Sequence, residues 1–182
     1  MRTPTASMDR KRWVMQAVEQ YEARLLRFAS RLLGDDHAAR DAVQHSFLRL
    51  CRQPLDGLGD SPGPWLFTVC RNYAVDLLRG RRRTEQTDEG GAADCCDRAL
   101  DPAAAAERAD LCRHVTALVD QLPLPQREAL ALWSEGFCYR EIADITGASE
   151  GNVRVIVHRA LKRLREHPAM RPLCGKQDEV RT

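Results

Sequence analysis

The stretch YREIADITGASEGNVRVIVH, residues 139–158, decides the fold of this part of the chain. With Tyr139 counted as the first position, the small residue Ala143 falls at the fifth, Gly147 at the ninth and Val153 at the fifteenth. Two helices that cross at a short turn need a small residue where they approach, and they favour glycine in the turn because it adopts positive φ at little cost. The spacing therefore predicts a helix-turn-helix.

The second helix of this motif has an apolar stripe and a polar face. The stripe consists of Val153, Ile156, Val157, Ala160, Leu161 and Leu164. Such a helix can enter the major groove with its N-terminal half on base edges, while its Lys and Arg side chains contact phosphates. A solvated basic surface without a ligand is the alternative. The residues we expect at DNA are Arg140, Ser149, Gly151, Asn152, Arg154, Val155, His158, Arg159 and Lys162.

The composition favours helices throughout the 182 residues. There are 23 Ala and 21 Leu against 11 Val and 3 Ile, and Ala and Leu lose less on entering a helix than β-branched residues do. No apolar run exceeds the five residues 129–133, whereas a membrane span needs about 20. The polar, basic N-terminus does not read as a signal peptide. We therefore expect an all-α, cytoplasmic protein without membrane insertion.

The net charge of +2 conceals three segments of different sign. Residues 1–83 carry 15 basic and 9 acidic groups, residues 84–110 carry 2 and 8, and residues 111–182 carry 11 and 9. The middle segment contains no aromatic residue and begins Thr-Glu-Gln-Thr-Asp-Glu-Gly-Gly, a composition typical of a flexible linker. The predicted organisation is two small helical domains, 14–83 and 105–167, joined by an acidic linker over 84–104. An extension over 1–13 and a tail over 168–182 flank them.

Local signals predict three helices in the first domain. An apolar stripe from Val14 to Leu32 gives a helix of about 20 residues that ends at Gly34. Asp35 or Asp36 can cap the next helix, whose apolar face holds Ala39, Val43, Phe47 and Leu50 and which Pro54 stops. Pro62 and Pro64 suit the start of a third helix, with the stripe Trp65, Val69, Tyr73 and Leu77.

Two motifs of this domain resemble conserved region 2 of the sigma-70 family. The run Asp41-Ala-Val-Gln-His-Ser-Phe-Leu-Arg-Leu50 is similar to its core-binding helix, and Trp65-Leu-Phe-Thr-Val-Cys-Arg-Asn-Tyr-Ala-Val-Asp-Leu-Leu-Arg79 to the helix that follows. The helix-turn-helix domain then resembles region 4. With nothing similar to region 3 between them, the layout is similar to the extracytoplasmic-function (ECF) group.

The resemblance implies a sigma factor that binds core RNA polymerase, opens the −10 element and reads the −35 element. The implied partners are promoter DNA, the β′ clamp helices and β flap of the polymerase, and an anti-sigma factor that often inhibits such proteins. It places core binding on Asp41, Gln44, Phe47 and Leu48. It places −10 binding on Trp65, Arg71, Asn72, Arg79, Arg81, Arg82 and Arg83.

Two other functions are compatible with parts of the sequence. The helix-turn-helix also resembles that of stand-alone LuxR-type regulators, although the N-terminal half shows no strand pattern for a receiver domain. The seven cysteines, odd in number, suggest a reducing compartment, and Cys95-Cys96 could serve a redox- or metal-sensing interaction protein. No nucleophile–base pair, zinc spacing or phosphate loop stands out, so we expect no catalytic site, no metal and no cofactor.

Overall fold

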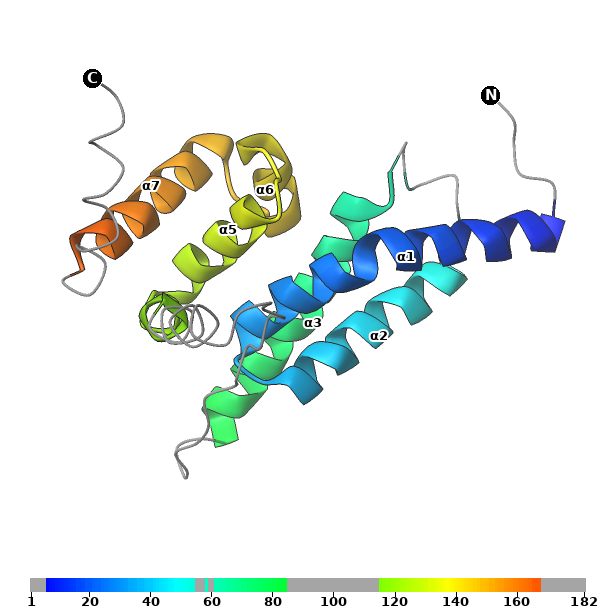
Figure 1. Ribbon diagram of the computed structural model, residues 1–182, viewed down its shortest axis with the longest axis horizontal. Helices are drawn as coiled ribbons and strands as arrows, with labels where there is room; N and C mark the ends of the chain where they lie inside the picture. The colour runs from blue at the N-terminus through cyan, green and yellow to red at the C-terminus, as the bar shows by residue number, and fades with distance from the viewer. Residues whose placement is uncertain (1–5, 55–57, 59–60, 85–114, 168–182) are drawn as a thin grey trace, which may run out of the picture. The chain divides into compact units, whose positions relative to one another are not determined.

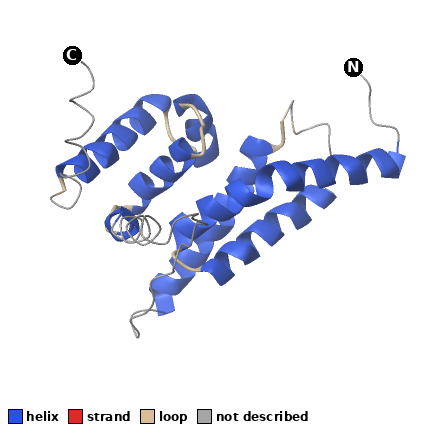
Figure 2. Ribbon diagram, in the orientation of Figure 1, coloured by secondary structure: helices blue, strands red, loops and turns tan. Residues whose placement is uncertain are grey.

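The computed structural model describes residues 6–54, 58, 61–84 and 115–167, which form helices joined by turns (Figure 1). No strand occurs among these residues, and the all-α prediction is confirmed (Figure 2). They fall into two compact units, an N-terminal one made of α1, α2 and α3 and a C-terminal one built around α5 and α7. The predicted tail lies outside the described residues, as does the predicted linker beyond Thr84.

The N-terminal unit is a three-helix bundle of α1 (Ala6–Leu33), α2 (Asp36–Arg52) and α3 (Gly63–Thr84). Its centre is aromatic, since the rings of Phe28 and Phe67 lie 5.4 Å apart in a tilted arrangement and both side chains are fully buried. Leu25, Leu32 and Leu50 complete the surrounding core. The predicted stripe of α1 thus faces its two neighbours over most of its length.

Helix α1 begins at Ala6, earlier than the sequence predicts. A long-range contact accounts for the added turns. The guanidinium of Arg10 donates hydrogen bonds to the carbonyls of Cys51 and Gln53, each at 2.7 Å, and to that of Leu50 at 3.4 Å. The last carbonyls of a helix have no partner within it, so Arg10 satisfies the C-terminal end of α2.

The junction between α1 and α2 follows the predicted signals. Gly34 has φ of 63°, the left-handed conformation that ends many helices. Asp35 is the N-cap of α2, and its carboxylate accepts hydrogen bonds from the backbone N–H groups of His37 at 2.9 Å and Ala38 at 3.1 Å. Helix α2 ends at Arg52, two residues before Pro54.

The buried face of α3 differs from the predicted stripe. Of the four stripe residues only Val69 is buried, whereas Trp65, Tyr73 and Leu77 are half-buried. Because α3 packs against both α1 and α2, its core-facing surface spans a wider arc than a single stripe. The side chains at the centre of that surface are Leu66, Phe67, Cys70 and Ala74.

The C-terminal unit contains helical residues 115–120, α5 (Leu124–Ser134), α6 (Tyr139–Thr146) and α7 (Glu150–Glu166). Gly147 has φ of 73° and ends α6, and Ser149 caps α7, so the predicted helix-turn-helix is present. Helix α5 packs on α7. The core cluster of this unit includes Leu122, Leu130 and Ala160, with Val119, Leu161 and Leu164 packed against them.

Candidate polymerase and nucleic-acid interfaces

The outer face of α2 combines polar and apolar groups. Asp41 and Gln44 are exposed, Leu48 is 53% exposed and Phe47 is half-buried. A large exposed aliphatic side chain beside an exposed carboxylate and amide suits a protein interface, where an apolar centre is surrounded by polar groups. The four residues predicted to bind the polymerase therefore share one accessible helix, with Phe47 the least accessible.

Helix α2 is tied to α3 behind this face. The imidazole of His45 stacks on the ring of Tyr73, with centroids 4.6 Å apart and planes 25° apart. The hydroxyl of Ser46 is buried and donates to the carbonyl of Ala42 at 2.7 Å. Burial raises the pKa of Cys70 to about 12, so this cysteine is a neutral packing thiol at physiological pH.

The outer face of α3 presents Asn72 and several arginines. Asn72 is exposed, and its Oδ1 accepts a hydrogen bond from Arg71 Nη1 at 3.2 Å. Arg79 is exposed and lies 3.6 Å from the carboxylate of Asp76. An amide has both donor and acceptor groups, so Asn72 can pair with a base edge, and the arginines beside it can contact phosphates.

Among the predicted phosphate ligands, Arg81 forms an ion pair with a residue distant in the sequence. Its Nη2 lies 2.6 Å from Oδ2 of Asp35, the carboxylate that caps α2. The backbone N–H of Ala38 lowers the pKa of Asp35 most, and the hydrogen bond from Arg81 lowers it further. The pair joins the end of α3 to the start of α2. The neighbouring side chains of Arg82 and Arg83 lie outside the described residues.

Replacement of Asp35 tests this junction. We expect Asp35→Ala to lower the free energy of unfolding by about 1–2 kcal/mol, since it removes a helix cap, and Asp35→Asn to cost less because asparagine also caps. The half-exposed ion pair contributes less than about 1 kcal/mol. Because the folded-state pKa is lowered, this charge contribution is complete above pH 3.8 and is lost as the pH falls through the folded value.

Denaturant unfolding at pH 7 and pH 3 measures these differences. The gap between wild type and Asp35→Asn should shrink at the lower pH, whereas exposed Glu22→Gln on α1 serves as a control with little effect at pH 7. An Asp35→Ala variant as stable as wild type at both pH values would refute the capping role.

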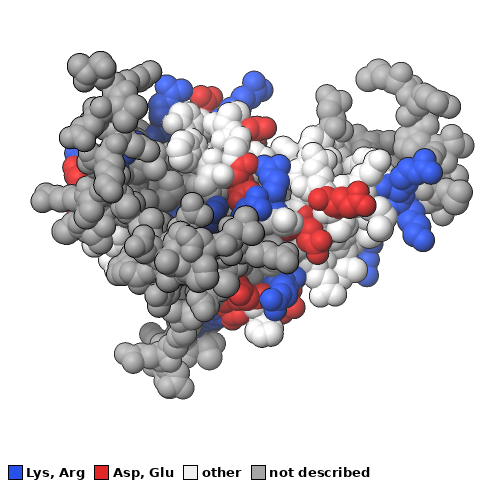
Figure 3. All heavy atoms as spheres, viewed as in Figure 1, with Lys and Arg blue, Asp and Glu red and all other residues white. Residues whose placement is uncertain are grey.

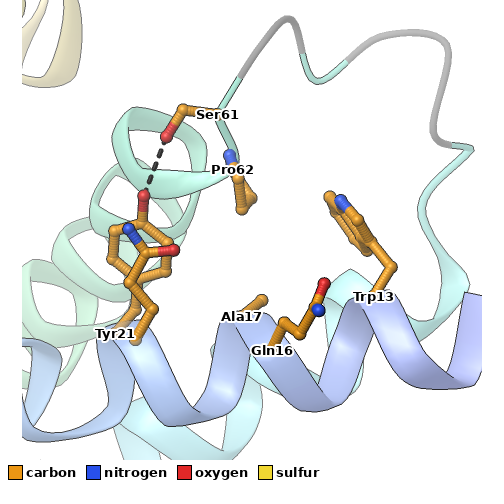
Figure 4. A pocket seen from close by; sticks show the side chains of 7 residues that line it. Trp13, Gln16, Ala17, Tyr21, Ser61 and Pro62 are labelled. Atoms are coloured by element: carbon orange, nitrogen blue, oxygen red, sulfur yellow. Dashed lines mark hydrogen bonds between the residues drawn. The ribbon is translucent and has the colours of Figure 1, made fainter.

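A shallow hollow of about 230 Å³ opens between α1 and the segment before α3 (Figure 4). The hydroxyls of Tyr21 and Ser61 lie 2.8 Å apart at one end, and the ring of Trp13 stands at the other. Asn72 is not among the residues that line it. The structure therefore does not bring Asn72 and this hollow into one site. The remaining lining residues are Gln16, Ala17, Gln20 and Pro62.

The predicted DNA-facing residues of the helix-turn-helix are all exposed on α6, the turn or α7. Val155 is 44% exposed, and Ser149 also serves as the N-cap by accepting a hydrogen bond from the N–H of Asn152 at 3.3 Å. The stripe on the opposite side of α7 is buried at Val153, Val157 and Ala160. Helix α7 thus has one buried face and one exposed face, as predicted.

Acidic side chains accompany the basic ones on this open face. Arg154 Nη2 lies 3.3 Å from the carboxylate of Glu150, and Lys162 Nζ lies 3.7 Å from that of Glu166. Figure 3 shows blue and red side chains next to one another on the visible surface. Exposed i,i+4 pairs of this kind contribute little to stability, about 0.3–0.5 kcal/mol, so DNA phosphates can replace the carboxylates.

The sequence interpretation missed one contact of this interface. The guanidinium carbon of Arg154 lies 5.5 Å from the centroid of the Tyr139 ring, at the start of α6. The i,i+4 spacing indicates the pairing of Arg154 with Glu150, but no local pattern indicates a contact across the turn.

The described residues do not support the alternative of a redox- or metal-sensing protein that uses Cys95 and Cys96. Cys95 and Cys96 lie outside the described residues, and within the described ranges no three His, Cys, Asp or Glu side chains are grouped to hold a metal. In the same ranges no helix is long and apolar enough to cross a membrane.

These features define a helical protein that has a three-helix unit and a helix-turn-helix unit in one chain, and comparison with known proteins assigns its family. Residues 17–84 match the model of sigma-70 region 2, and residues 113–164 match that of sigma-70 region 4. The chain belongs to the sigma-70 family of RNA polymerase sigma factors, in the ECF group.

Several named relatives support this assignment. The chain is 34% identical to the ECF RNA polymerase sigma factor SigL of Mycobacterium tuberculosis and 32% identical to the sigma factor CarQ of Myxococcus xanthus, over 81% of this chain and 84% of each relative. It is 30% identical to the ECF sigma factor SigE of Mycolicibacterium smegmatis over 85% of this chain, and spans 61% of SigE's length.

Two solved structures show a similar fold. The sigma factor RpoE of Bartonella quintana, solved with the anti-sigma factor NepR, has a TM-score of 0.67 and 26% identity, with 88% of this chain and 96% of RpoE covered. CnrH, solved with the cytosolic domain of CnrY, has a TM-score of 0.57 and 22% identity, with 85% and 86% covered, and it supports the fold alone.

Proposed function

We propose that this chain binds core RNA polymerase and directs it to promoters, where it opens the −10 element and reads the −35 element. The observation that supports this most is the occurrence of both regions in one chain. Each region has a helix with an accessible polar face, α3 in the region 2 match and most of α7 in the region 4 match. A stand-alone LuxR-type regulator has no need of the region 2 bundle.

In this proposal α2 docks onto the clamp helices of the β′ subunit. Leu48 supplies exposed apolar surface, and Asp41 and Gln44 supply hydrogen-bonding groups around it. Phe47 contributes from its half-buried position. The β flap is the partner proposed for the C-terminal unit.

The −10 function falls to α3. Asn72 is placed to pair with a base that has left the duplex stack, and Trp65, Arg71, Arg79, Arg82 and Arg83 hold the strand around it. Arg81 belongs to the same proposed set, and phosphate binding by Arg81 would compete with its ion pair to Asp35. The hollow beside Tyr21 and Ser61 is a separate surface of the same unit.

The −35 function falls to α7 in the major groove. Its first two turns carry Asn152 and Arg154 for base edges, and its later turns carry Arg159 and Lys162 for phosphates. The remaining proposed contacts are Arg140, Ser149, Gly151, Val155 and His158, all exposed.

The proposed division of the chain assigns 14–83 to polymerase and −10 binding, 84–104 to an acidic linker and 105–167 to −35 binding. Residues 168–182 form a tail. The chain acts in the cytoplasm as a specificity subunit without a catalytic site of its own. An anti-sigma factor is a proposed partner, since RpoE of Bartonella quintana was solved with one.

Holoenzyme assembly tests the polymerase-binding face. We expect Leu48→Asp to weaken binding to core RNA polymerase about tenfold or more, because it places a charge at the apolar centre of the proposed interface. Met15→Asp on α1 is the matched control, since Met15 is also 53% exposed in the same unit. Fluorescence titration of labelled protein with core polymerase measures both. Equal affinities of the two variants would count against the α2 assignment.

A further inference from the structure

We propose that Tyr139 is a positioning residue for sequence readout: its ring, with the carboxylate of Glu150, holds the guanidinium of Arg154 ready for a base edge. The inference deepens the proposed −35 function and rests on it. Tyr139 begins α6 and Arg154 lies in the second turn of α7, so the contact joins the two helices of the motif.

The geometry gives Arg154 two different partners. Its guanidinium carbon stands 5.5 Å from the Tyr139 ring centroid, and its Nη2 is 3.3 Å from Glu150 Oε1. The arginine side chain is nevertheless 67% exposed, so this arrangement leaves it accessible to DNA. A long, exposed arginine samples many rotamers unless neighbours restrict it, and Tyr139 on α6 and Glu150 on α7 both favour this arrangement.

The two partners interact with different parts of the Arg154 guanidinium. An aromatic ring interacts with the face of the cation and leaves the N–H groups at its edge available for hydrogen bonds. A carboxylate occupies those N–H groups and must be displaced when a guanine edge or a phosphate takes them. Tyr139 can therefore remain in contact while DNA is bound, whereas Glu150 gives up its hydrogen bond to DNA.

This difference sets the expected consequences of substitution. Loss of the ring should lower affinity for the preferred −35 sequence by about two- to fivefold, the size of an exposed cation–π contact. The same change should reduce discrimination at the base pair that Arg154 reads and leave other positions unaffected. Tyr139→Phe retains the ring face and should behave as wild type.

A double-mutant cycle on the holoenzyme tests the inference. Wild type, Tyr139→Leu, Arg154→Ala and the double variant bind the −35 duplex selected from a randomised library by the wild-type holoenzyme, and also each single-base-pair variant of that duplex. The inference predicts that Tyr139→Leu changes discrimination at one position in the wild-type background and changes nothing there once Arg154 is alanine. Tyr139→Gln repeats the cycle if Tyr139→Leu lowers the melting temperature.

Four results would overturn the inference. If Tyr139→Leu weakens all duplexes equally, or if the two substitutions have independent effects on discrimination, Tyr139 has a structural role only and the −35 function stands. If Tyr139→Phe loses discrimination as Tyr139→Leu does, the hydroxyl rather than the ring face matters. A wild-type holoenzyme without any sequence preference would overturn both the inference and the proposed −35 function.

Discussion

We expect Asn72→Ala to slow promoter opening while closed-complex binding remains near the wild-type level. The side chain is exposed on α3, and its amide can pair with the edge of a base that has left the duplex. Extrusion of a base costs a few kcal/mol, and side-chain pairing with its edge offsets about 1–3 kcal/mol of that cost. The loss of one such interaction corresponds to about a 5- to 150-fold change in the opening equilibrium.

Permanganate reactivity of unpaired thymines and the lifetime of heparin-resistant complexes measure this step. Glu22→Gln on α1 is the control in the same unit, because it changes an exposed side chain and leaves Asn72 and the arginines of α3 intact. Permanganate footprints of Asn72→Ala that equal those of wild type would contradict the assignment. A parallel loss of closed-complex binding would assign Asn72 to initial recognition instead.

The second large effect is expected for Arg154→Ala. A bidentate contact between arginine and a base edge provides about 1–3 kcal/mol of discrimination, so the variant should lose that amount on the preferred −35 sequence and little on a scrambled one. Breaking the ion pair between Arg154 and Glu150 costs little free energy, because the pair is exposed and its N–O distance is 3.3 Å. Binding of holoenzyme to the two duplexes measures the difference.

Lys162→Ala provides the comparison for this prediction. Lys162 is exposed later on α7 and is expected to contact phosphate, so its removal should weaken all sequences alike and reduce the salt dependence of binding. If Arg154→Ala behaves in the same way, losing affinity equally on preferred and scrambled DNA, Arg154 is a phosphate contact.

Local chemistry made the junction of α1 with α2 and the turn of the helix-turn-helix predictable. Gly34 and Gly147 adopt the positive φ that the turn positions require, and Asp35 accepts the cap hydrogen bonds that its position indicates. Each of these signals depends only on residues within one helical turn. The exposed face of α7 was predictable for the same reason, because the helical period fixes which side chains point away from the apolar stripe of α7.

Contacts between distant residues were not predictable from spacing. Arg10 reaches the carbonyls at the end of α2, Arg81 pairs with Asp35, and Tyr139 stacks against Arg154, each joining separate helices. An arginine run in the sequence gives no information about which guanidinium is held by a carboxylate. These contacts extend α1 beyond its predicted start and give Arg81 a structural partner.

Run-off transcription with core RNA polymerase and a randomised promoter library tests the central claim most directly. The account predicts that core polymerase alone initiates without promoter dependence, and that added full-length protein directs initiation to a subset of promoters sharing −35 and −10 sequences. The combined Asn72→Ala and Arg154→Ala variant should lose that enrichment while remaining folded. Absence of promoter-dependent initiation across the library, with folded protein bound to a compatible core polymerase, would contradict the account.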